Sequence, residues 1–210
     1  MRADIRLWTA IAIIGICGFS IAQGYRIARF SMMNVHASEN QTEILRTWAA
    51  VPGLASRALQ TQLAGNIDPS DLKAANDRRE VLSAILTIRP LSSIDWLSLS
   101  GMQLLTDRPM AQVLESLELS VLTGPNEGYV MAERGIFGIS LWEDLSRDLK
   151  SRAALDLGPI IYPRTPAEGA EGEKFRTVLA TKSELVRNEL RKALVATGIS
   201  PKEIEQRLGF

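Results

Sequence analysis

The most regular pattern of hydrophobic and polar positions lies between Pro90 and Pro125 and predicts a pair of helices. The second half repeats apolar residues three and four positions apart, as one face of an α-helix requires, at Met110, Val113, Leu114, Leu117 and Val121. The first half holds a similar apolar set, at Trp96, Leu97, Leu99, Gly101, Leu104 and Leu105. Between them, Thr106 or Asp107 is predicted to cap the second helix, with Pro109 at its start. A helix pair of about 34 residues that closes on proline has the period of a tetratricopeptide (TPR) repeat.

Helical patterns continue on both sides of this pair. Before it, the sequence predicts a helix over residues 43–63 and another that is capped by Asp68 and ends at Arg89. After it, Asn126 is predicted to cap a helix that reaches Trp142, and apolar residues continue at helical spacing to residue 157. The sequence therefore predicts an all-α protein with a TPR-like helical-repeat domain over residues 43–157.

The last quarter of the chain is predicted to be a loop followed by helices. Residues 158–172 contain three prolines and three glycines, which favours a loop, and Ile160, Ile161 and Tyr162 are expected to pack against the helices. The C-terminal segment 173–210 is predicted to hold one helix over residues 173–197 and a short one after it. Gly198 is the expected C′ residue of the first. Ser200 and Glu203 have the spacing of a capping box for the second, whose apolar residues are Ile204 and Leu208.

The N-terminus carries the most hydrophobic stretch of the chain. Residues 7–22 are uncharged and almost wholly apolar. At about 1.5 Å per residue they cover roughly 24 Å, and residues 23–25 bring the segment close to the ~30 Å of a hydrocarbon core. Trp8 and Tyr25 are placed as interfacial anchors. We favour a transmembrane signal anchor within residues 1–25, while a cleaved signal peptide and a buried core helix stay open.

The orientation of this segment depends on few charges. Arg2 and Arg6 precede it and Arg26 and Arg29 follow it, so the positive-inside rule gives little margin. We prefer an N-terminus in the cytoplasm, with the main domain on the other side of the membrane. A polar linker over residues 26–42 then leads to the helical domain.

Composition narrows the chemistry. The chain has 24 basic residues (Lys and Arg) and 24 acidic residues (Asp and Glu). Its net charge therefore gives no reason to expect a nucleic-acid partner. The single cysteine, Cys17, excludes an intramolecular disulfide and a cysteine-based zinc site. The single histidine, His36, leaves catalytic triads and histidine metal sites without their other members. We therefore predict no cofactor, no metal and no catalytic residue.

Two kinds of candidate site have a simpler structural interpretation. The carboxylate pairs Glu143–Asp144 and Glu115–Glu118 have the residue type that a glycosidase needs, but acids on amphipathic helices usually form a solvated face. Three glycines have no preceding strand and no following Lys-Ser/Thr, so close helix packing is favoured over a phosphate loop. They are Gly128, Gly135 and Gly138.

Basic and aromatic residues raise the question of a glycan ligand. Two basic clusters offer a possible contact with an anionic polysaccharide or lipid headgroup, although the acids between them favour ordinary surface pairs. These clusters are Arg78, Arg79 and Arg89, and Arg187, Arg191 and Lys192. Trp96 and Trp142 have the chemistry to stack on sugar rings, but their spacing with leucines favours a core position.

The region from Pro90 to about Leu157 resembles TPR-like proteins associated with bacterial exopolysaccharide and O-antigen biosynthesis. The residues that carry the resemblance are PLSSIDWLSLSGMQLL, TDRPMAQVLESLELSVLTGPNEGY and LWEDLSRDLK. The resemblance implies one membrane-spanning helix before a short helical-repeat domain that faces the periplasm. It places Trp96, Leu99 and Gly101 in the first repeat helix.

The resemblance also implies a function. We expect a single-pass protein of the bacterial inner membrane, held by residues 7–25, whose periplasmic domain is a scaffold or adaptor in exopolysaccharide or O-antigen assembly or export. Its expected partners are the proteins of that assembly, and it is expected not to be an enzyme. A periplasmic chaperone or assembly factor is the main alternative, and a glycan-acting enzyme that uses carboxylates such as Glu143 and Asp144 is another.

Overall fold

The structure, a computed structural model of the chain, describes residues 71–163 and 166–209. The chain divides into two compact units, residues 1–62 and 63–210, and all described residues belong to the second. Several sequence predictions lie outside the described residues. They are the membrane segment 7–25, the linker 26–42, the helix 43–63, the cap Asp68, and the single Cys17 and His36.

Within the described residues every regular element is a helix, which confirms the all-α prediction. The helices are α4 (Leu72–Ile88), α5 (Ser93–Leu105), α6 (Met110–Thr123), α7 (Gly128–Ser140), the 3₁₀ helix η1 (Trp142–Asp144), α8 (Arg147–Asp156), α9 (Gly158–Ile161), α10 (Pro166–Ala180), α11 (Glu184–Ala196) and α12 (Pro201–Leu208).

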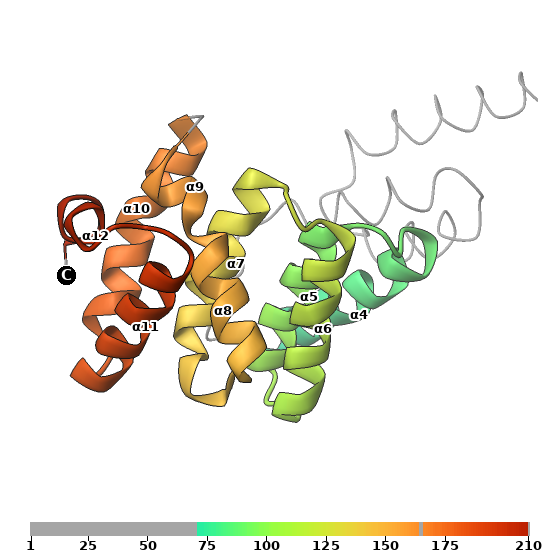
Figure 1. Cartoon of the computed structure of the whole chain (residues 1–210). Helices are drawn as coiled ribbons and strands as arrows, with labels where there is room; N and C mark the ends of the chain where they lie inside the picture. The colour runs from blue at the N-terminus through green and yellow to red at the C-terminus, as the bar shows by residue number, and fades with distance from the viewer. Residues whose placement is uncertain (1–70, 164–165, 210) are drawn as a thin grey trace, which may run out of the picture. The chain divides into compact units, whose positions relative to one another are not determined.

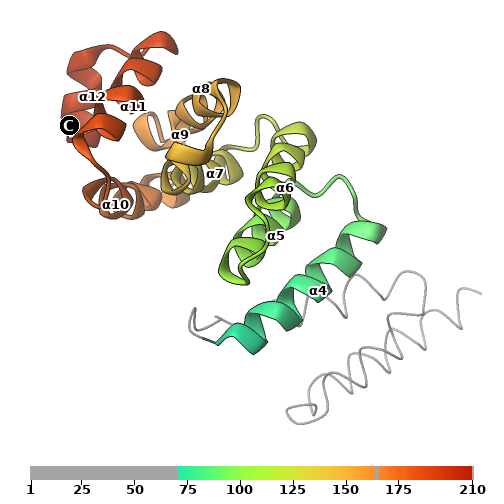
Figure 2. The ribbon, with the colours of Figure 1, turned by 90° about the horizontal axis from the view of Figure 1, so that it is seen from below.

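The helices of the second unit follow a repeat-like order. α5 packs against α6, and α7 packs against α8, as two successive helix pairs (Figure 1). The first helices of the two pairs also contact one another, because α5 packs against α7, and α7 in turn packs against α10. α4 lies on the other side of α5, and α11 packs against α8 (Figure 2). This stacking of neighbours on neighbours is how helical-repeat proteins build their core.

One hydrophobic core runs through most of these helices. It extends from Leu97 and Val113 through α7, α8, α9 and α10 to α11 and α12. Trp142 is 1% exposed within it, so the predicted core position of this tryptophan is confirmed. A smaller cluster joins α4 to α5, and Trp96 is half-buried against it. Its Nε1 donates to the backbone oxygen of Pro90 at 2.8 Å.

The α5–α6 pair packs through small polar side chains as well as leucines. Four serines of these helices are buried: Ser93, Ser100, Ser116 and Ser120. Ser100 Oγ donates to the backbone oxygen of Val113 on α6 at 2.7 Å. Ser93 Oγ donates to the Glu127 carboxylate, just before α7. These two hydrogen bonds satisfy the buried hydroxyls of Ser100 and Ser93.

A buried arginine on α7 joins the ends of α6 and α8. Arg134 is 1% exposed, and its Nε donates to Asp156 Oδ2 at 2.5 Å while its Nη2 donates to Oδ1 at 3.1 Å. Its Nη1 donates to the backbone oxygens of Ser120 at 2.9 Å and Gly124 at 3.2 Å. One guanidinium group on α7 thus hydrogen-bonds to the ends of two other helices, and its contact with Asp156 has the bidentate geometry that suits arginine and carboxylate.

Asp156, at the end of α8, is shared by two guanidinium groups. Arg152 lies one turn earlier, with Nη2 2.9 Å from Asp156 Oδ1, and it also donates to the backbone oxygen of Pro125. Burial raises the pKa of Asp156, while the hydrogen bonds and charges of Arg134 and Arg152 oppose that rise. Arg134 and Asp156 are both buried, so Arg134 depends on this carboxylate for compensation of its charge, while Asp156 is compensated by Arg134 and Arg152 together.

The predicted N-cap of α6, Thr106 or Asp107, is wrong. Neither Thr106 nor Asp107 caps α6, whose N-cap is Pro109 with no side-chain hydrogen bond. Asp107 instead follows α5 with a φ of 56°, and the N–H of Arg108 donates back to the Gln103 oxygen at 2.9 Å. The aspartate takes the left-handed position that closes a helix, which Asp tolerates better than most residues.

Two further helix starts differ from their predictions. Asn126 does not cap α7, because the N-cap is Glu127, and the Glu127 side chain accepts the Ser93 hydroxyl. α4 is capped by Asp71, whose Oδ1 accepts the N–H of Ala74 at 2.9 Å, and it starts at Leu72. Both regions contain several residues able to cap, so the sequence alone does not choose among them.

The segment predicted as a loop, residues 158–172, is partly helical. It contains α9 and the first half of α10, which begins at Pro166, a residue suited to a first helical turn. Its glycines cost a helix only about 1 kcal/mol each. The burial of Phe175 and Leu179 one and two turns later favours the helix. Ile160 and Ile161 are buried as predicted.

The C-terminal helix predicted over residues 173–197 is two helices. α10 ends at Ala180, and α11 begins after Ser183, whose Oγ accepts the N–H of Val186 at 3.3 Å. A serine cap followed by an acidic first turn starts a new helix even though apolar residues continue at helical spacing.

The predictions for the chain's last turn and helix are confirmed. Gly198 has a φ of 95° after α11, and Ser200 and Glu203 form the capping box of α12. Tyr162 is 47% exposed rather than packed, but its hydroxyl donates to Glu203 Oε1 at 2.7 Å and links α9 to α12.

Two of the three glycines in α7 allow it to approach α8 closely. A Cβ on Gly138 would lie 2.7 Å from the Cβ of Ala153, and one on Gly135 would lie 2.8 Å from Leu157 Cδ2. The prediction of close helix packing is confirmed for these two. Gly128 is the first residue of α7.

We expect Gly138→Ala to lower the free energy of unfolding by about 1–3 kcal/mol, because the added methyl group overpacks the α7–α8 contact. Gly101→Ala in α5 is the matched control, since its Cβ would meet nothing within 4 Å. It should raise stability by up to about 1 kcal/mol through helix propensity. Urea denaturation followed by circular dichroism measures both, and equal effects would contradict the close approach.

We expect Asp156→Leu to lower the free energy of unfolding by about 3–5 kcal/mol, because it leaves the buried Arg134 without a carboxylate. Arg134→Met should cost somewhat less, because Asp156 keeps its ion pair with Arg152. The double variant should be closer to wild type than either single one. Glu143→Gln, at a carboxylate 68% exposed and 3.9 Å from Lys182, should change stability by less than about 1 kcal/mol. Additive losses in the double variant would contradict the mutual dependence.

Candidate functional site

Helices α4, α5, α7 and α10 together line a groove of about 480 Å³. It is lined from α4, α5, α7 and α10 by Arg78, Leu97, Ser98, Gly101, Met102, Leu105, Glu133, Ile136, Phe137, Ser140, Glu171, Lys174 and Val178. Elements far apart in the sequence therefore supply one continuous surface. Stacked helical repeats use surfaces of this kind to bind extended partners.

Helical spacing places these side chains in the groove. On α5 the contributing positions are spaced by about one turn, at Leu97, Gly101 and Leu105. α7 contributes Glu133, Ile136 or Phe137, and Ser140 with the same spacing, and α10 contributes Glu171, Lys174 and Val178. Each helix thus presents one row of groove-lining side chains, which we call its stripe. Because α7 contacts both α5 and α10, the three stripes lie side by side.

The floor of the groove is apolar and accessible. Leu97 and Ile136 are nearly buried beneath it, while Met102, Phe137 and Val178 are half-buried. A ligand that covers the half-buried side chains gains about 25 cal/mol for each Å² of apolar surface removed from water. Methionine adds a flexible side chain that adapts to different shapes. The arrangement can hold the apolar side chains of a partner and presents no reactive group among them.

One end of the groove is charged. Lys174 Nζ lies 3.0 Å from Glu171 Oε2 on α10 and 3.4 Å from Glu133 Oε1 on α7. The Tyr129 hydroxyl donates to Glu133 Oε1 at 2.9 Å. The hydrogen bond to Glu171 is the main cause of a raised pKa for Lys174, with Glu133 adding to the rise and burial opposing it. The pKa of Tyr129 is raised by its hydrogen bond to Glu133 and by burial.

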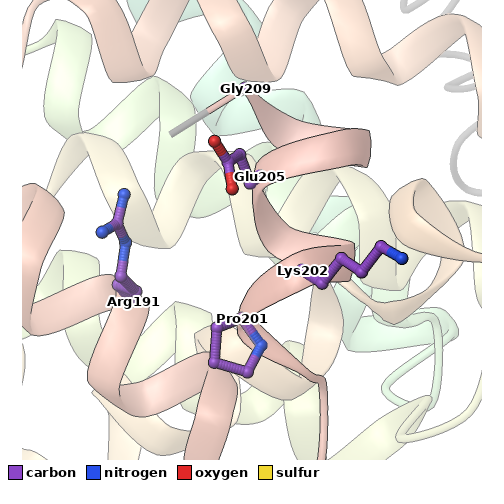
Figure 3. A pocket seen from close by; sticks show the side chains of 5 residues that line it. All are labelled: Arg191, Pro201, Lys202, Glu205 and Gly209. Atoms are coloured by element: carbon purple, nitrogen blue, oxygen red, sulfur yellow. The ribbon is translucent and has the colours of Figure 1, made fainter.

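A second cavity, of about 590 Å³, lies at the C-terminal end between α11 and α12 (Figure 3). Its lining residues are all exposed: Arg191, Pro201, Lys202, Glu205 and Gly209. Figure 3 shows the Lys202 side chain pointing away from Arg191, so the two cations do not converge on one position. This cavity has no buried apolar wall, and we regard it as a surface depression.

A third cavity, of about 480 Å³, lies where the start of α7 meets α8 and α9. It is lined by Asn126, Gly128, Met131, Leu155, Gly158, Pro159 and Tyr162. No acidic or basic side chain is among these residues. The groove across α5, α7 and α10 therefore combines apolar surface with charge in a way that the other two cavities do not.

The carboxylates considered from the sequence lie elsewhere. Glu143 and Asp144 are exposed on η1, and Glu115 and Glu118 are exposed on α6. None of the four lines any of the three cavities described above. The sequence did not single out Glu133, Glu171 or Lys174, although the spacing of Glu171, Lys174 and Val178 would have placed them on one face once α10 was recognised as a helix.

The basic residues and the second tryptophan have structural neighbours. Arg78 lines the groove and Arg191 lines the C-terminal cavity, while Arg187 lies 4.0 Å from Glu184. Trp142 Nε1 donates to Glu189 Oε2 at 3.0 Å, and Lys150 Nζ contacts the same oxygen at 3.0 Å. The hydrogen bond from Lys150 is the main cause of a lowered pKa for Glu189, and the one from Trp142 adds to it. Trp142 is 1% exposed and Lys150 Nζ lies 5.5 Å from the centre of its ring, so its face is not free to stack on a sugar.

Two absences apply to the residues that the structure describes. No three His, Cys, Asp or Glu side chains come together there as metal ligands. None of its helices is both long enough and apolar enough to cross a membrane. Comparisons with protein-family models, with curated proteins and with solved structures find no match to this chain.

We expect Lys174→Met to lower the free energy of unfolding by about 1–2 kcal/mol, because Glu171, only 5% exposed, then loses the ammonium group beside it. Lys192→Met, at an exposed position on α11, is the control and should change stability by less than about 0.5 kcal/mol. Denaturant titrations of the two variants make the comparison. Equal losses would show that Glu171 does not depend on Lys174.

Proposed function

We propose that this protein is a membrane-anchored scaffold that binds partner proteins in its groove and takes part in the assembly or export of a cell-envelope polysaccharide. The groove is the observation that carries the binding role. It draws its apolar floor from α5, α7 and α10, so a partner segment can contact three successive elements of the stack.

The physical basis of such binding is burial of apolar surface with orientation by charge. Half-buried Met102 and Phe137 offer surface for a partner's apolar side chains, and the Glu133–Lys174–Glu171 group gives the groove a distinct polar end. Interfaces commonly combine an apolar centre with a polar rim in this way.

The membrane anchor and the pathway rest on the sequence. The apolar segment 7–22 favours a tether, and a tether raises the effective concentration of the domain toward other membrane proteins. The polysaccharide pathway and the periplasmic location come from the resemblance of the region 90–157 to TPR-like proteins of exopolysaccharide and O-antigen biosynthesis.

Affinity capture tests this function. The full-length chain, with a tag after its C-terminus, is expressed in bacteria, captured from solubilised membranes and analysed by mass spectrometry. Gly101→Trp is the groove variant, because its side chain would start in open space within the groove. Leu122→Trp is the matched control, since Leu122 is 73% exposed on α6 and does not line the groove.

We expect wild type and Leu122→Trp to recover polysaccharide polymerases, flippases, ligases or glycosyltransferases, and Gly101→Trp to lose them. Recovery of the same proteins with Gly101→Trp would contradict a role for the groove. Recovery of unrelated unfolded proteins would favour a chaperone or assembly factor instead. A shortened, soluble product would contradict the anchor.

A further inference from the structure

Glu171 is a buried carboxylate inside the groove whose hydrogen bonding is incomplete. It is 5% exposed, and Lys174 donates a hydrogen bond to its Oε1 at 3.1 Å. Lys174 Nζ also lies 3.0 Å from Oε2, but Oε2 accepts no hydrogen bond. A carboxylate has about four lone-pair positions, and a buried oxygen without a donor costs free energy.

The positive charge near this carboxylate is shared. Lys174 is the ammonium group for both Glu171 and Glu133, so this end of the groove has two carboxylates and one cation. Lys174 itself is 60% exposed, which leaves room for a second group beside it. Arg78 lines the α4 side of the groove and has an interaction of its own within the protein.

The excess of carboxylates at this end of the groove determines which ligand charge it favours. Two carboxylates with one ammonium group favour a cationic donor and oppose an anionic one. The adjoining surface of Ile136, Phe137 and Val178 is apolar, so the ligand that fits both parts joins a cation to large apolar groups. A lysine or arginine with apolar neighbours has this composition.

We propose that the groove binds a segment of a partner protein in which a Lys or Arg lies beside large apolar residues, with its charged group at Glu171 and Glu133. This inference rests on the proposed function, and it adds the chemistry of the partner. The partner's positive charge balances the second of the two carboxylates that share Lys174, and its apolar neighbours cover Phe137 and Met102.

Peptide selection tests the proposal on the full-length chain in lipid nanodiscs. The probe is a display library of random 12-residue peptides, selected in parallel against wild type, Glu171→Gln, Glu173→Gln and Gly101→Trp. Glu173→Gln is the matched control, because Glu173 is exposed on the same helix and does not line the groove. Circular dichroism melting curves check that each variant is folded.

We expect wild type and Glu173→Gln to enrich peptides with a Lys or Arg next to large apolar residues. Glu171→Gln should enrich apolar peptides without the basic residue, and Gly101→Trp should enrich none. Groove-dependent peptides that show no preference for Lys or Arg would overturn this inference and leave the proposed binding role intact. Peptides that bind Gly101→Trp as well as wild type would contradict both.

A synthetic peptide then measures the contact from the partner's side. Replacement of the selected lysine by norleucine, which keeps the chain length and removes the charge, should weaken binding to wild type about tenfold or more. The same replacement should weaken binding to Glu171→Gln less than about twofold. Equal losses on the two proteins would overturn the contact with Glu171 even if the Gln variant is less stable.

Discussion

The arrangement of the helix pairs depends on the buried guanidinium group of Arg134. It binds the end of α6 through two backbone oxygens and the end of α8 through Asp156, from a position on α7 between them. A guanidinium has five N–H donors in a fixed plane, so the three segments must meet at one geometry to satisfy it.

The groove is a consequence of that placement. Glu133 and Arg134 are neighbours in the sequence and point to different sides of α7, one into the groove and the other into the core. Arg134 holds α7 against the ends of α6 and α8, and α7 also contacts α5 and α10, which supply the other stripes of the groove. Gly135 and Gly138 act with it, because they let α7 lie close to α8. Binding surface and core share one helix, so changes in the core of α7 should be felt in the groove.

Local patterns predicted the helical class, the α5–α6 pair, the core position of Trp142 and the closure of the chain by Gly198 and the Ser200 capping box. The errors lie where several signals compete. Glycines and prolines in residues 158–172 hid the first half of α10, and continuous apolar spacing hid the break before Ser183. The charged end of the groove was missed because Glu133 and Glu171 meet only through the packing of α7 on α10, which spacing along one segment does not reveal.

Hydrogen exchange measured by mass spectrometry on the full-length chain tests the central claim most directly. If Arg134 joins the two pairs, amides in the second half of α6, in α7 and in α8 should be protected to a similar degree, because they open together. Arg134→Met should lower protection in all three at once and leave α11 and α12 less affected. Wild-type protection of α6 in that variant, with loss confined to α7, would contradict the account.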